Sequence, residues 1–127
     1  MHKTAIQTSI ENYINAYNSF DVAGMMALLH PEIAFENISN GEVTLSIKGI
    51  ANFKQQAEEA TRYFTTREQK ITQLTIKDDS AEALIAYTAI LAHDLPNGIK
   101  AGDKLELEGR SVFTFRDGKI IRLQDYS

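Results

Sequence analysis

Asp125, close to the end of the chain, is the residue with the best case for acid–base chemistry. Alternate residues of a β-strand share one face, so a strand over 119–126 places Asp125 on the same face as Ile121 and Leu123. Apolar neighbours disfavour an ionised carboxyl group and raise its pKa, which lets it exchange protons near neutral pH. The alternative is an acid at the rim of the fold, solvated and chemically inert.

The other residues that often carry chemistry give no second centre. His93 precedes Asp94, but neighbours on a strand point to opposite faces, which favours a solvated histidine beside a turn. His30 and Pro31 are better explained as a helix stop than as part of a metal site. The chain has no cysteine and no glycine-rich nucleotide loop, Gly-x-Ser-x-Gly or His-Glu-x-x-His motif. We therefore expect no disulfide, no metal and no cofactor.

Length and composition indicate an ordinary globular protein. The 127 residues correspond most simply to one domain over 1–127, with 43% hydrophobic and 24% charged residues. The net charge is −4 and the basic residues are dispersed, which argues against nucleic acid or a membrane surface as a partner. The first twenty residues contain neither a signal-peptide core nor a membrane span, so the expected location is the cytoplasm.

Helical spacing of apolar residues marks the N-terminal half. It predicts helices over about 4–19, 21–29 and 50–64. Thr4 and Gln7 have the spacing of a capping box, Asp21 can cap the second helix, and Pro31 is expected to stop it. Tyr13 falls on the apolar stripe of the first helix, where a tyrosine most often serves core packing.

Alternating residues predict strands in the rest of the chain, and turn residues separate them. Asn40-Gly41 and Asp117-Gly118 are strong hairpin signals, and Asp78 to Ser80 and a Pro96-Asn97-Gly98 segment supply further turns. The expected strands are 33–38, 43–47, 68–77, 82–93, 104–115 and 119–126.

The strand predicted over 82–93 is apolar on both faces. Leu84, Ala86 and Ile90 alternate with Ile85 and Tyr87. A strand of this kind is covered on both sides. Because the helices can cover only one side of the sheet, we expect a homodimer that forms through the other.

Several short segments together have the character of one known fold family. They are residues 17–21, 26–32, 35–37, 48–50 with Phe53, and 115–120. With them, essentially the whole chain resembles the nuclear transport factor 2-like superfamily, in particular its SnoaL-like branch. The resemblance implies an α+β fold in which a cone-shaped, curved, mainly antiparallel (mixed) sheet wraps around three helices from the N-terminal half.

Known activities of this superfamily can be tested residue by residue. Ketosteroid isomerase needs a tyrosine, a carboxylate base and a second carboxyl group, and the matching positions here hold Tyr13, Asn37 and Ser111. Limonene epoxide hydrolase needs an Arg-x-Asp pair and a late Asp, of which only Asp125 is matched. The resemblance thus implies neither standard enzyme. SnoaL-type polyketide cyclases use a late acidic residue, and Asp125 is the candidate.

These observations predict a cone-shaped pocket for a small, largely apolar metabolite. Asp125 and Tyr13 are the expected catalytic residues for a cofactor-free isomerase, cyclase or hydratase type of reaction. The alternatives are a non-catalytic carrier, favoured by an asparagine at the base position, and a protein–protein association module. The expected ligand-binding residues are Tyr17, Phe35, Asn37, Phe53, Ser111 and Phe113.

Overall fold

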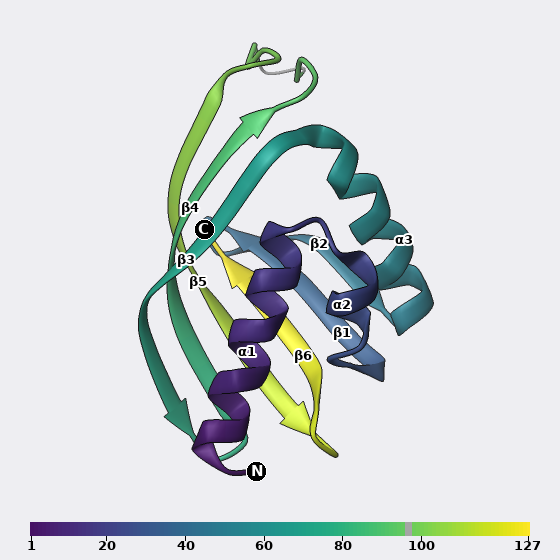
Figure 1. The fold of residues 1–127 in the computed structure, drawn as a ribbon, viewed down its shortest axis with the longest axis vertical. Coiled ribbons are helices and arrows are strands. Elements are labelled where there is room, and N and C mark those ends of the chain that lie inside the picture. The colour runs from purple at the N-terminus through teal and green to yellow at the C-terminus, as the bar shows by residue number, and fades with distance from the viewer. Residues whose placement is uncertain (96–97) are drawn as a thin grey trace.

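A computed structural model of the chain describes residues 1–95 and 98–127, and shows a curled six-stranded sheet with three α-helices inside the curl (Figure 1). The predicted turn at Pro96-Asn97-Gly98 involves residues 96–97 and lies outside the described residues. The helices are α1 (Lys3–Asn18), α2 (Val22–Met26) and α3 (Ile50–Ala60), followed by a 3-10 turn at Thr61–Tyr63. The strands are β1 (Leu29–Ser39), β2 (Glu42–Lys48), β3 (Phe64–Lys77), β4 (Ser80–Leu91), β5 (Lys104–Arg116) and β6 (Lys119–Tyr126).

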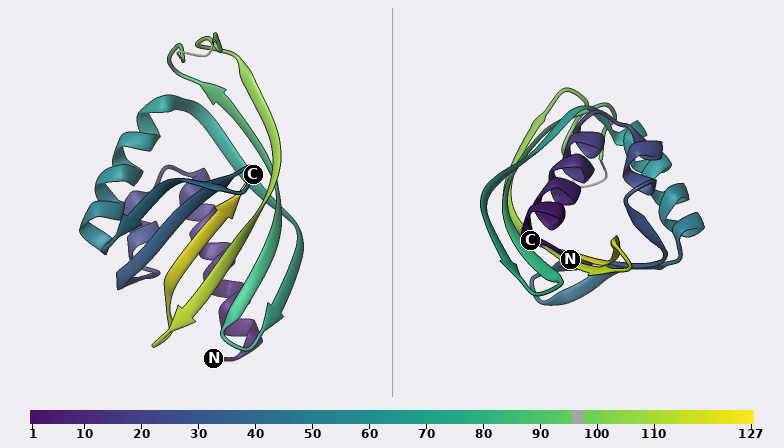
Figure 2. Two further views of the ribbon diagram at one scale, coloured as in Figure 1. Left: turned by 180° about the vertical axis from the view of Figure 1, so that it is seen from behind. Right: turned by 60° about the horizontal axis from the view of Figure 1, so that its bottom comes forward.

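The sheet has the strand order β2-β1-β6-β5-β4-β3. Neighbouring strands are antiparallel except β1 and β6, the first and last strands of the chain, which run parallel side by side within the sheet. Figure 2 shows the sheet bending around α1, with α2 and α3 closing the open side. The predicted α+β cone is confirmed.

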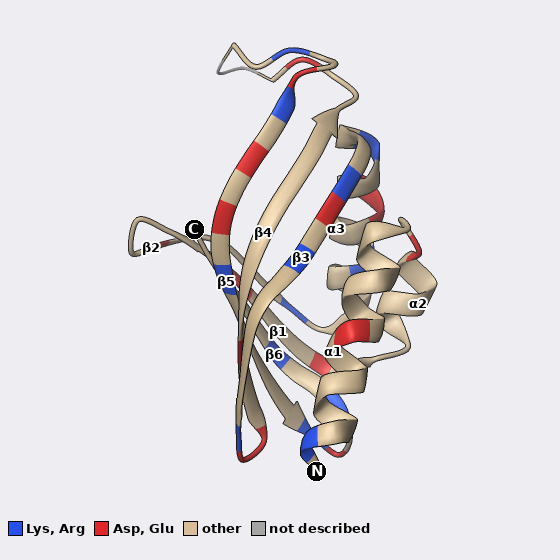
Figure 3. Cartoon of the chain, turned by 60° about the vertical axis from the view of Figure 1, so that its left-hand side comes forward, with Lys and Arg blue, Asp and Glu red and all other residues tan. Residues whose placement is uncertain are grey.

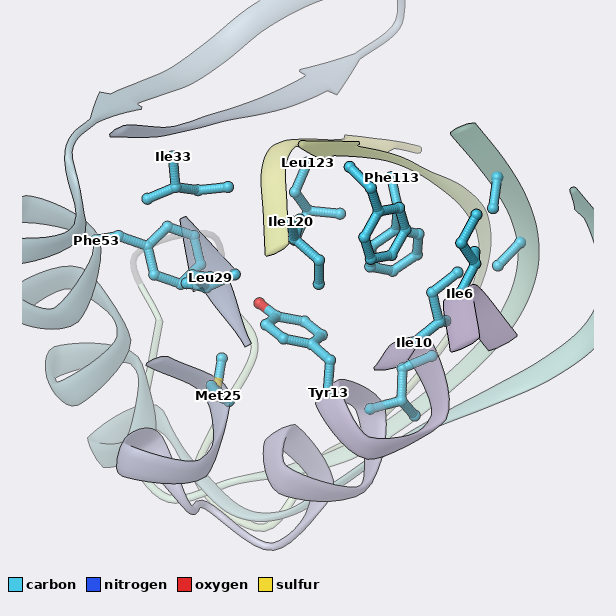
Figure 4. Packing of buried hydrophobic residues seen from close by; sticks show 14 of the residues in the cluster. Ile6, Ile10, Tyr13, Met25, Leu29, Ile33, Phe53, Phe113, Ile120 and Leu123 are labelled. Carbon is cyan, nitrogen blue, oxygen red and sulfur yellow. The ribbon is translucent and has the colours of Figure 1, made fainter. Parts of the chain in front are cut away.

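Helix α1 packs its apolar stripe against the concave face of the sheet. Ile6 and Ile10 are fully buried, and Tyr13 and Ile14 are nearly so, as the spacing predicts. Figure 4 shows this stripe facing Phe113 across the core. The predicted capping box is wrong, because α1 already begins at Lys3 with His2 at its N-cap and no side-chain cap.

The second helix is shorter than predicted. The Asp21 side chain caps α2, accepting a hydrogen bond of 2.9 Å from the Gly24 amide. The helix ends at Met26, and Leu29 begins β1, where it pairs with Ile120. Pro31 therefore lies in a strand, within the 29–34 stretch where the β1–β6 pairing is irregular; proline lacks the amide hydrogen that regular pairing needs.

Both predicted hairpin turns are confirmed. Asn40 and Gly41 have φ values of +52° and +79°, and Asp117 and Gly118 have +53° and +77°, the left-handed pair that a type I′ turn requires. Behind the second turn, the β5–β6 register shifts between Thr114 and Phe115.

This shift corrects the predicted alternation of β6. Ile120, not Ile121, is the fully buried residue, and Ile121 is only partly buried. A β-bulge adds one residue to a strand and so changes which side chains face inward. Leu123 and Asp125, which follow the bulge, keep the predicted inward face.

The outer face of β4 carries Leu84, Ala86 and Ile90, all partly buried in the single chain. Figure 3 shows the positions of charged residues along β3 and β5, on either side of a nearly uncharged β4. A homodimer through this face stays a prediction. No helix in the described parts of the chain has the length and apolar character needed to cross a membrane.

Candidate functional site

Two rows of side chains cross the concave face of the sheet and form one wall of a cavity. In the first row Asn37 of β1, Asp125 of β6 and Ser111 of β5 lie side by side in register. Two residues along, Phe35, Leu123 and Phe113 form a parallel, apolar row. Because alternate residues share a face, each strand contributes one polar and one apolar side chain to the same wall.

The helices complete the cavity, whose volume is about 200 Å³. Tyr13 and Tyr17 come from α1, Met25 from α2, and Phe53 and Gln56 from α3. The structure brings every predicted site residue to this one cavity: Tyr13, Tyr17, Phe35, Asn37, Phe53, Ser111, Phe113 and Asp125 all line it. The walls are mostly aromatic and aliphatic, as is typical of small-molecule sites.

Asp125 is the acidic residue of the cavity. The Ser111 hydroxyl donates a hydrogen bond of 2.7 Å to its Oδ1 atom, and Ser111 is itself buried. Burial raises the pKa of Asp125 from its ordinary 3.8 to about 6, and the hydrogen bond from Ser111 only partly offsets this rise. The carboxyl is therefore mainly ionised at neutral pH, yet basic enough to take up a proton.

Tyr13 supplies a hydroxyl to the same space. Its ring packs edge-on against Phe113, with the ring centres 6.1 Å apart, and its hydroxyl points away from α1 into the interior (Figure 4). Burial, followed by the negative charge of Asp125, raises the pKa of Tyr13 well above its usual value. Tyr13 therefore keeps its proton and can act only as a hydrogen-bond donor or acceptor, never as a base.

Asn37 is held from outside the cavity. Its side-chain amide donates a hydrogen bond of 2.8 Å to Thr44 Oγ1. The Thr44 hydroxyl in turn donates a hydrogen bond of 3.2 Å to the backbone carbonyl oxygen of Asn37. Asn37 therefore contributes a fixed polar group beside Asp125. The neighbouring Glu36 points to the other face of the sheet, where Arg122 and Gln124 bind its carboxylate at 3.0 and 3.1 Å.

Gln56 of α3 was not predicted as a cavity residue, and neither were the two polar residues Arg67 and Gln69. The strand that carries them was expected to begin at residue 68, which left Arg67 in a loop. The structure begins β3 at Phe64. The signal was alternation, since Arg67 and Gln69 share a face with the core residue Ile71.

A second hollow adjoins the cavity at the C-terminal end of β6. It shares Tyr17, Asn37, Gln69, Ser111 and Asp125 with the cavity, and Tyr126 and Leu107 form part of its outer wall. Asp125 is partly buried and thus faces space on two sides. A ligand can approach the carboxyl without unfolding the sheet.

The sequence matches the model of one protein family, the SnoaL-like domain, over residues 10–123. The chain belongs to the SnoaL-like domain family. This match spans α1 to the middle of β6, and so includes every strand that lines the cavity. No curated protein matches the chain.

Solved structures share the SnoaL-like fold of this chain. A candidate polyketide cyclase from Xanthomonas campestris pv. campestris has a TM-score of 0.83 and 21% identity, with 98% of this chain and 91% of that one covered. TsrD from Streptomyces laurentii has a TM-score of 0.81 and 18% identity, covering 98% and 89%. An LEH-like epoxide hydrolase from M. tuberculosis has a TM-score of 0.78 and 19% identity, covering 97% and 82%. At these identities the likeness concerns the fold.

The SnoaL-like cavity places a basic carboxylate and a neutral phenol in one apolar space. A carboxylate of this kind can remove a proton from carbon, and a phenol can donate a hydrogen bond to the oxygen that becomes negative. In the described residues, no three His, Asp or Glu side chains gather into a group that could hold a metal ion.

Proposed function

We propose that this SnoaL-like chain binds a small, largely apolar carbonyl compound and exchanges a proton with it through Asp125. The observation that carries the proposal is the position of Asp125, whose carboxyl has a pKa of about 6 and faces an apolar cavity. The superfamily resemblance supports a late acidic residue in this role. The reaction class is cofactor-free acid–base chemistry, as in an isomerase, a cyclase or a hydratase.

In the proposed step, the Asp125 carboxylate accepts a proton from the carbon next to the ligand's carbonyl group. The electron pair of that C–H bond moves to the carbonyl oxygen, which becomes an enolate, and the Tyr13 hydroxyl donates a hydrogen bond to it. The proton on Asp125 exchanges with solvent, and delivery of a solvent-derived proton to the same carbon gives exchange, whereas delivery to another carbon gives isomerisation. Attack of the enolate carbon on a second carbonyl of the same ligand, whose oxygen takes the proton from Asp125, gives cyclisation.

Proton exchange can be measured before the natural ligand is known. The probe is 2-tetralone, a neutral bicyclic ketone with acidic C–H groups, incubated with the protein in deuterium oxide. We expect the protein to accelerate deuterium incorporation beside the carbonyl, as followed by proton NMR, and to bind the ketone in the same samples. Exchange should require ionised Asp125, so the rate should rise with pH through about 6 and then level off.

The outcomes separate the alternatives. Binding with accelerated exchange supports acid–base catalysis. Binding without exchange favours the non-catalytic carrier, and no binding of apolar ketones contradicts the metabolite pocket.

A further inference from the structure

Arg67 is a buried charge without an acidic partner. Its side chain lines the cavity, and only 4% of the residue's surface is exposed. None of the ion pairs formed within residues 1–95 and 98–127 includes Arg67. Burying a charge costs free energy unless the charge is paired, and arginine is rarely this buried without a counter-ion.

The contacts around Arg67 fix its position but leave the N–H donors of Nη2 without a partner in the part of the chain that the structure describes. Its Nε atom donates a hydrogen bond of 2.8 Å to the Tyr17 carbonyl, in the negative C-terminal turn of α1. The guanidinium carbon lies 3.7 Å from the centre of the Tyr17 ring and 4.6 Å from that of Phe20. A guanidinium has five N–H donors, and among the described residues Nη2 is enclosed without any partner.

Asp125 does not supply the missing partner. It is the acidic residue of the same cavity, but its carboxylate accepts its hydrogen bond from Ser111. The amide side chains that line the same cavity, Gln56 and Gln69, are neutral. The cavity therefore combines one cationic group with an aromatic pair, Phe35 and Phe53, whose ring centres lie 5.4 Å apart.

We propose that Arg67 binds a carboxylate group of the ligand, so that the metabolite is a small carboxylic acid with an apolar body. This inference deepens the proposed function and rests on it, because it assigns a second polar group to the same ligand. The planar guanidinium fork matches a carboxylate in two parallel hydrogen bonds. The apolar body lies against Phe35 and Phe53, and the anion takes up donors that the protein itself leaves unused.

The test compares benzoate with benzamide, two probes of nearly equal size and shape that differ in charge. Their affinities are measured by calorimetry or ligand-observed NMR at a pH where benzoate is ionised. We expect the wild-type protein to bind benzoate at least about tenfold more tightly than benzamide, the ratio typical of a charge-assisted hydrogen bond. In Arg67→Gln this preference should disappear while benzamide binding is retained.

Two further variants make the result specific. Arg62→Gln removes the same charge from an exposed residue next to β3 and should leave the benzoate preference unchanged. Arg67→Lys keeps the charge but loses the planar fork, so it should retain only part of the preference for benzoate. It also tests the anion site if Arg67→Gln does not fold.

Equal binding of both probes by the wild type overturns the anion site but leaves the cavity as a site for neutral ligands. Binding of neither probe, nor of 2-tetralone, overturns the proposed function as well.

Discussion

Asp125→Asn is expected to reduce protein-accelerated deuterium exchange of 2-tetralone by about 10²- to 10⁴-fold, the usual contribution of a positioned general base. An amide has the same shape as the carboxyl and can still accept the hydrogen bond from Ser111, but it cannot accept a proton from carbon. The measurement is the NMR exchange rate at saturating ketone. A rate equal to that of the wild type would rule out Asp125 as the base.

The stability of Asp125→Asn provides a control for folding. The folded-state pKa of Asp125 is raised from 3.8 to about 6, so the folded protein holds this proton more tightly than the unfolded chain does. Wild-type stability should therefore fall as the pH rises through about 4 to 6. Above this range Asp125→Asn should be more stable, by at most about 3 kcal/mol, because the amide never ionises. A loss of exchange in a protein that is more stable at neutral pH cannot be a folding defect.

Asp117→Asn is the matched control. Asp117 is an exposed aspartate in the turn that begins β6, at a positive φ that asparagine tolerates well. We expect the exchange rate of this variant to equal that of the wild type.

Phe113→Ala is expected to lower the free energy of unfolding by about 3 to 5 kcal/mol, measured by denaturant titration. Phe113 is 1% exposed, lies in the apolar row between Leu123 and Ala81, and meets the Tyr13 ring edge-on. Removal of the Phe113 ring enlarges the cavity and also takes away the surface that holds the Tyr13 ring in place. Ligand affinity should therefore fall together with stability.

Tyr63→Ala provides the comparison, because this aromatic ring is 47% exposed and should cost far less. A loss below about 1 kcal/mol for Phe113→Ala would mean that this part of the core is loosely packed and that the cavity is not shaped by it.

The turns and the last strand could be predicted because local chemistry decides them. Asn40-Gly41 and Asp117-Gly118 provide left-handed backbone at little cost, and the strand 119–126 has the predicted bounds. The inward face of Leu123 and Asp125 then follows from alternation. Five of the eight residues assigned to the pocket lie on strands and come together for the same reason, given the register that the fold imposes on β1, β5 and β6. The other three, Tyr13, Tyr17 and Phe53, lie on helices α1 and α3.

The errors occurred where distant contacts override local pattern. Leu29 continues the helical spacing of α2, but its backbone instead pairs with Ile120, more than half the chain away. Ile121 fits strict alternation, but the register shift opposite Thr114 and Phe115 turns it away from the core. Arg67 fell between the predicted third helix and the strand predicted from residue 68, and its packing against Tyr17 and Phe20, which are distant in sequence, explains its buried place in β3.

The most direct measurement for this account is the titration of the Asp125 side-chain carboxyl by carbon-detected NMR, assigned by comparison with Asp125→Asn. A carboxyl in an apolar cavity, with one hydrogen bond from Ser111, should titrate with a midpoint near 6. A midpoint near 4, the ordinary value of a solvated aspartate, would contradict the proposal that this cavity contains a base suited to neutral pH.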